Sequence, residues 1–146
     1  MIDPIILLED DPDDVFFVER ALREAKIANP LVLFDSAAQA RELLSSNLVD
    51  RPVLALVDMR LRDGETGVEF LRWLREQHGP LGSTPAMMLT GIICAQHHHM
   101  SRTLGSLCYL RKPITDTVFK VAIQGLGFES VPATDDDGTG MRIIRR

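Results

Sequence analysis

The feature of this sequence that most restricts its fold is a regular alternation of short apolar runs with longer stretches of helical periodicity. The apolar runs lie at residues 5–8, 31–34, 53–57, 86–89 and 107–110. Helices are predicted to start near Pro12 with Asp11 as the N-cap, after Ser36, and over 66–77, 93–104 and 116–126. Strands with so few polar residues are typical of a parallel sheet that helices cover on both faces. The sequence therefore predicts a doubly wound α/β domain with a five-stranded parallel sheet and five helices.

Size and charge exclude several classes of protein. With 146 residues, 45% apolar and 25% charged, the chain is expected to form one globular domain. A formal charge of −5 argues against a basic surface for nucleic acid. The apolar runs are too short to cross a bilayer, and the N-terminus lacks the basic region of a signal peptide. We therefore expect a cytoplasmic protein with no direct nucleic-acid or membrane contact.

The end of the chain differs in composition from the rest. We expect the folded domain to cover residues 1–128 and a flexible C-terminal tail to cover 129–146. Residues 135–139 match the DxDGT nucleophile pattern of haloacid-dehalogenase-like phosphatases. That pattern must follow a buried strand and precede a large domain, and neither condition holds here. We interpret the match as accidental.

Polar side chains stand directly after four of the five predicted strands. Glu9 and Asp10 follow the first, Asp58 the third, Thr90 the fourth and Lys112 the fifth. Active residues in doubly wound sheets collect at the carboxyl ends of the strands, so these groups are expected to converge. Each residue alone is compatible with an ordinary cap or turn, but the combination favours a chemical site.

The residue types at this edge suit a metal ion and phosphoryl transfer. Clustered carboxylates without Cys or His favour a hard cation such as Mg²⁺. Asp58 is the best candidate nucleophile, and Glu9 and Asp10 are better placed to hold the ion. Lys112 would supply a positive charge to the phosphoryl group, and Thr90 a hydrogen bond.

Four segments together resemble the receiver domain of response regulators in two-component signalling. They are residues 5–14 (IILLEDDPDD), 56–64 (LVDMRLRDG), 88–91 (MLTG) and 109–113 (YLRKP). The resemblance extends from about residue 5 to residue 126. The opening acidic segment is similar to that of stand-alone receivers, including those that partner phytochrome-type kinases. It implies a flavodoxin-like strand order, 2-1-3-4-5.

The resemblance also implies roles for individual residues. Asp58 would accept a phosphoryl group from a phosphohistidine, and Glu9 and Asp10 would hold Mg²⁺ together with Asp58 and the backbone carbonyl of Arg60. The other implied roles are a switch hydroxyl for Thr90, an aromatic switch for Tyr109 and phosphoryl contact for Lys112.

The function expected on this basis is a phosphorylation-controlled interaction switch rather than an enzyme acting on an external substrate. The chain would catalyse its own phosphorylation and dephosphorylation. Its partners would be a sensor histidine kinase or a histidine phosphotransfer protein, and a downstream protein bound by the face of helix 93–104, strand 107–110 and helix 116–126. A second copy of the chain, forming a homodimer, is a further partner compatible with this reading.

Three other functions remain open at this stage. The chain could be a phosphorelay intermediate, a pseudo-receiver that binds partners without phosphorylation, or a small Mg²⁺-dependent phosphohydrolase. The intact acidic set argues against the pseudo-receiver. His97, His98 and His99 do not favour a metal cluster, because consecutive helical side chains point about 100° apart. We interpret them as surface residues with a partner contact as the alternative.

Overall fold

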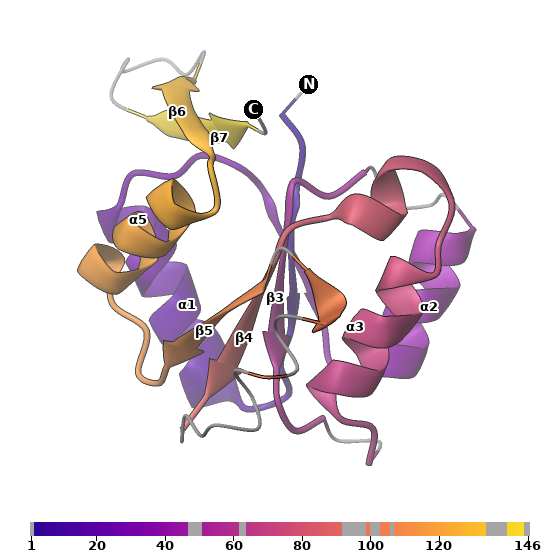
Figure 1. Cartoon of the computed structure of the whole chain (residues 1–146). Coiled ribbons are helices and arrows are strands. Elements are labelled where there is room, and N and C mark those ends of the chain that lie inside the picture. Colours follow the sequence, from indigo (N-terminus) through magenta and orange to yellow (C-terminus); the bar gives the residue numbers. More distant parts are fainter. Residues whose placement is uncertain are drawn as a thin grey trace.

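The chain folds into a five-stranded parallel sheet with helices on both faces. The computed structural model describes residues 2–46, 51–61, 64–91, 99, 103–105, 107–133 and 140–144. The strand order β2-β1-β3-β4-β5 confirms the expected order 2-1-3-4-5. Figure 1 shows α1 and α5 on one face and α2 and α3 on the other. The elements of this layered unit are β1 Ile5–Leu8, α1 Pro12–Glu24, β2 Leu31–Phe34, α2 Ala37–Ser45, β3 Leu54–Asp58, α3 Gly67–Arg75, the 3-10 helix η1 Gly79–Ser83, β4 Ala86–Thr90, β5 Leu107–Arg111 and α5 Asp116–Gly125.

Each described α-helix begins at a side-chain cap that the sequence supplies. The Asp11 carboxylate accepts a hydrogen bond from the Asp13 N–H, and Pro12 occupies the first turn of α1 as predicted. Ser36, Thr66 and Thr115 cap α2, α3 and α5 in the same way. Among the residues that the structure describes, no helix is long and apolar enough to cross a membrane.

The helix predicted over residues 93–104 lies mostly outside the described residues. We call residues 93–104 the α4 segment. Residues 99, 103 and 104 are helical. His99 is exposed, whereas His97 and His98 fall outside the described part of the chain. The structure therefore describes four α-helices in the sheet domain, and the fifth stays a prediction.

The two faces of the sheet bury separate apolar clusters. Ile5 and Leu7 of β1 point toward α1 and α5, and Ile6 and Leu8 point toward α2 and α3. All four are fully buried. This placement explains the uninterrupted apolar character of the strand, because both faces of a central parallel strand are covered.

The described residues of the C-terminal segment form two strands. β6 (Glu129–Pro132) and β7 (Met141–Ile144) pair as an antiparallel hairpin. Ile143 is 1% exposed and packs in the cluster on the α1 and α5 face. The described residues of this segment therefore contribute an apolar side chain to the core, and the flexibility of the tail stays a prediction. The domain boundary at residue 128 stays a prediction.

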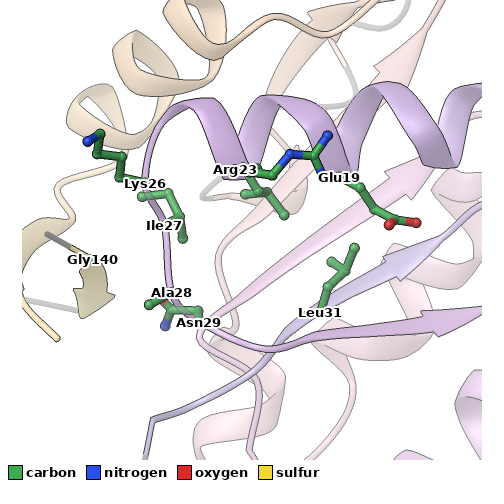
Figure 2. Close-up of a pocket in the computed structure, with 9 residues that line it drawn as sticks. Glu19, Arg23, Lys26, Ile27, Ala28, Asn29, Leu31 and Gly140 are labelled. Atoms are coloured by element: carbon green, nitrogen blue, oxygen red, sulfur yellow. The ribbon is translucent and has the colours of Figure 1, made fainter. Parts of the chain in front are cut away.

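The Asn29 side chain links β7 to the rest of the domain by hydrogen bonds. Its side-chain Nδ2 donates to the carbonyl oxygens of Asp3 at 2.9 Å and Ile143 at 3.2 Å, and its Oδ1 accepts from the Ile143 N–H at 2.8 Å. The amide thereby satisfies both backbone groups of Ile143, as a neighbouring strand would. Figure 2 shows Asn29 in the connection between α1 and β2, on the wall of a cavity of about 530 Å³ that also includes Gly140.

We expect Asn29→Ala to destabilise the protein by about 2–3 kcal/mol, because it leaves two buried backbone groups of Ile143 without their partner and removes the hydrogen bond to the Asp3 carbonyl. Urea unfolding followed by circular dichroism measures this loss. Gln124→Ala removes an exposed amide from α5 and serves as the control. Equal unfolding midpoints for the two variants would contradict the role assigned to Asn29.

Candidate functional site

The side chains that the sequence places after the strands meet at the carboxyl edge of the sheet. Glu9, Asp58 and Thr90 are 1%, 8% and 6% exposed, respectively. β1 and β3 are in register at Leu8 and Val57, so Glu9, just after β1, lies level with Asp58, the last residue of β3. A cleft of about 560 Å³ opens there, lined by Asp58, Met59, Arg60, Thr66, Thr90, Gly91 and Lys112.

Three carboxylates lie close enough together to share a metal ion. One oxygen from each of Glu9, Asp10 and Asp58 lies within 4.8 Å of the others. The Glu9 carboxylate also accepts hydrogen bonds from the Asp10 and Asp11 N–H groups, both at 3.2 Å, which fixes its orientation. An all-oxygen set of this kind fits a hard divalent cation.

Lys112 is the cation that faces these carboxylates. Its ammonium Nζ lies 2.9 Å from Glu9 Oε2, 2.7 Å from Asp14 Oδ2 and 3.2 Å from Asp58 Oδ1. β5 carries Lys112 to this position, because the Lys112 N–H donates to the Thr90 carbonyl at the end of β4. The amine and the candidate nucleophile are therefore direct neighbours.

The site carries an excess of negative charge. Burial raises the pKa of Glu9 to about 7; the nearby Asp58 charge adds to the shift and the hydrogen bond from Lys112 opposes it. Burial lowers the pKa of Lys112, but its hydrogen bonds to Asp14 and Glu9 outweigh that effect and raise it. Lys112 therefore stays charged, and the carboxylates still lack full compensation.

The loop after Asp58 is held tightly against the start of α3. The Gly67 N–H donates to the Met59 carbonyl at 3.0 Å, and Arg60 pairs with Thr66. A Cβ on Gly67 would lie 2.3 Å from the Asp58 carbonyl oxygen, so this position has no room for a side chain. Glycine at the first residue of α3 thus allows the helix to approach the strand that carries Asp58.

Two further predicted site residues, Arg60 and Tyr109, make contacts that do not test the roles predicted for them. The Arg60 N–H donates to Asp58 Oδ1 at 3.4 Å, which puts this residue at the rim of the site. Tyr109 is half-buried in β5, three residues before Lys112, and packs against the cluster on the α2 and α3 face. The roles of both residues stay predictions.

Sequence reasoning missed one contact within the site and one ion pair of the loop that follows Asp58. The sequence patterns assign no role to Asp14 in the site, although its carboxylate contacts Lys112. The two residues lie 98 positions apart in the chain, so no local spacing signals their contact. Arg41 of α2 pairs with Glu65 of the loop after Asp58, and no sequence signal links these two residues.

Comparisons with known proteins agree with this geometry. No family model and no curated protein sequence matches the chain. Among solved structures, the bacteriophytochrome response regulator RtBRR is 29% identical with a TM-score of 0.81, and the match covers 95% of this chain and 87% of RtBRR. The bacteriophytochrome response regulator AtBRR is 27% identical with a TM-score of 0.79, covering 92% and 99%.

A third solved structure carries a metal. The Mn²⁺-bound form of response regulator Rcp1 is 26% identical with a TM-score of 0.70, covering 90% of this chain and 99% of Rcp1. The chain therefore has the fold of a response-regulator receiver domain, and the resemblance inferred from the sequence is confirmed. The acidic cluster is consistent with divalent metal binding.

We expect Glu9→Gln to stabilise the metal-free domain. The folded chain binds the Glu9 proton more tightly than the unfolded chain, because its pKa is raised from 4.5 to about 7. Ionisation of Glu9 therefore lowers stability as the pH rises through this window. The variant should be more stable than the unmodified protein by roughly 1–3 kcal/mol at pH 8 in EDTA.

Urea unfolding across a pH series tests this effect. The difference should disappear as the pH falls to about 4.5, because Glu9 is then protonated in the folded protein. Glu19→Gln removes an exposed carboxylate from α1 and should show no such dependence. A Glu9→Gln difference that is the same at all pH values would contradict the interpretation.

Proposed function

We propose that this protein is a single-domain response regulator that accepts a phosphoryl group on Asp58 from a sensor histidine kinase. The observation that carries the proposal is the position of the Asp58 carboxylate. It lies at an open cleft, beside the Lys112 ammonium and within 4.8 Å of the Glu9 and Asp10 oxygens. A nucleophilic oxygen, an acidic pair and a fixed cation are the groups that aspartyl phosphorylation requires.

The proposed metal ligands are the side chains of Glu9, Asp10 and Asp58 and the backbone carbonyl of Arg60. Mg²⁺, when bound, would neutralise the carboxylates and the incoming phosphoryl oxygens. The preference for Mg²⁺ rests on the carboxylate donor set, which suits a hard ion. The Mn²⁺-bound form of Rcp1 supports divalent binding in a protein of this fold.

The proposed transfer forms an oxygen–phosphorus bond and breaks a nitrogen–phosphorus bond. An Asp58 oxygen attacks phosphorus, and the electron pair of the broken bond returns to the donor imidazole. Lys112 and Thr90 would donate hydrogen bonds to the phosphoryl oxygens as charge develops there. Attack of water on the acyl phosphate would reverse the modification, so the chain would turn over only its own phosphate.

The proposed output is a change in partner binding. Hydrogen bonding of Thr90 to the phosphoryl group would let Tyr109 repack, which couples Asp58 to the face formed by the α4 segment, β5 and α5. On this face the side chains of Val118 and Val121 are 41% and 65% exposed. The proposed partners are a downstream protein, a histidine phosphotransfer protein or a second copy of the chain, in the cytoplasm.

The likeness to bacteriophytochrome response regulators supports a phytochrome-type kinase as the phosphoryl donor. Direct nucleic-acid binding is not part of the proposal, because the net charge of −5 offers no general attraction for phosphates. A phosphorelay intermediate differs from this proposal only in passing the phosphoryl group onward to a histidine.

We expect acetyl phosphate with Mg²⁺ to add one phosphoryl group, and Asp58→Asn to abolish the addition. Intact mass spectrometry reports the stoichiometry. Asp35→Asn removes an exposed carboxylate just after β2 and should be labelled normally. Labelling of Asp58→Asn at the original stoichiometry would contradict the assignment, and absence of labelling in the unmodified protein would favour a pseudo-receiver. Turnover of external phosphate esters would favour a phosphohydrolase.

We expect Thr90→Ala to accept the phosphoryl group without the structural response. Loss of the hydroxyl removes a hydrogen bond that only the active arrangement makes, so the population does not shift. Hydrogen exchange in β5, measured with and without beryllofluoride as the phosphoryl mimic, should change in the unmodified protein and in the control Ser45→Ala but not in Thr90→Ala. An unchanged exchange pattern in the unmodified protein would contradict the switch.

A further inference from the structure

Asp14 is a contact of Lys112 that the proposed phosphoryl transfer does not use. We propose that Asp14 is a positioning residue, which holds the Lys112 ammonium aside when a divalent cation occupies the acidic site. The inference rests on the proposed function, because it concerns binding of the cation that this function requires. It adds a fourth carboxylate to the site, one that serves the lysine rather than the metal.

The contacts of Lys112 divide into two kinds. Glu9 and Asp58, at 2.9 Å and 3.2 Å, belong to the carboxylate trio whose oxygens lie within 4.8 Å of one another. Asp14, at 2.7 Å, is the shortest of the three contacts and lies outside that trio. Lys112 therefore rests partly on proposed metal ligands and partly on an independent partner.

A divalent cation and the ammonium compete for the same oxygens. A cation placed among the oxygens of Glu9, Asp10 and Asp58 would come close to Lys112 Nζ, and like charges at such distances repel strongly in a partly buried site. Withdrawal of Lys112 without another anion would leave a half-buried charge unpaired, which is costly. Asp14 provides that anion, so it favours the metal-bound state over the metal-free state.

The backbone fixes Asp14 in this position. Asp14 belongs to the first turn of α1, whose start is set by the Asp11 cap and Pro12. The side chains of Asp14 and Lys112 are only 24% and 18% exposed, which limits screening of their pair by solvent. Asp13, its neighbour in the same turn, is exposed and makes no contact with Lys112 in the described part of the chain.

This geometry keeps Lys112 available for chemistry. Lys112 lines the cleft, and its contact with Asp14 does not involve Asp58, so the ammonium would remain beside the cleft after it leaves Asp58. A phosphoryl group on Asp58 could then receive a hydrogen bond from the retained ammonium. Asp14 thus influences cation binding and phosphoryl contact through Lys112 alone.

Titration of Mg²⁺ into the full chain, followed by Trp73 fluorescence or calorimetry, tests the inference. We expect Asp14→Asn to raise the Mg²⁺ dissociation constant by about five- to tenfold, because the lost ion pair is partly shielded from solvent and its effect exceeds that of an exposed pair. Asp13→Asn removes the same formal charge from the same turn and should change the constant by less than about twofold. Asp14→Glu keeps the charge and should recover part of the affinity.

Four outcomes decide the question. A larger effect for Asp14→Asn than for Asp13→Asn, with recovery in Asp14→Glu, supports the inference. Equal constants for the two asparagine variants overturn it and leave the proposed function intact. A lower unfolding midpoint of Asp14→Asn in EDTA with an unchanged dissociation constant also overturns it, because that pattern indicates a purely structural role. Absence of Mg²⁺ binding by the unmodified protein contradicts the proposed function itself.

Discussion

The contact of one ammonium with three carboxylates is the interaction on which the site depends. Lys112 reaches Glu9, Asp14 and Asp58 from the end of β5, and without it four acidic side chains would crowd one edge of the sheet. Burial is the main cause of the raised pKa of Glu9, and the nearby Asp58 charge adds to it. The site is therefore poised to take up a further cation, which is the condition that phosphoryl transfer to an aspartate requires.

The doubly wound sheet makes this concentration of charge tolerable. Fully buried apolar strands such as β1 supply the stability, and the charged groups follow only where these strands end. Close approach of α3 at Gly67 holds the strand that carries Asp58 against its loop. The residues that stabilise the core and the charged residues of the site are thus different residues. Substitutions in the site can therefore change its chemistry while the fold persists.

The two ends of the sheet carry different tasks. The C-terminal hairpin packs beside the chain entering β1 and β2, where Asn29 binds Ile143, and Figure 1 shows it at the opposite end of the domain from the carboxyl edge. The two described strands of the hairpin therefore extend the core at the end of the sheet away from the cleft. In the part of the chain that the structure describes, Val118 and Val121 of α5 are exposed. This arrangement is compatible with the proposed function, in which a phosphoryl donor reaches the cleft and a partner binds a separate surface.

Local patterns were sufficient for the sheet and for most of the site. Short apolar runs predicted the strands, the caps at Asp11 and Ser36 predicted helix starts, and chain order placed Glu9, Asp58 and Lys112 at one edge. These features follow from periodicity and from the geometry of parallel strands. Tertiary structure alone decided the Lys112 to Asp14 contact, the Arg41 to Glu65 pair and the burial of Ile143. Each of these joins segments far apart in the chain, where side-chain packing rather than local spacing determines which groups meet.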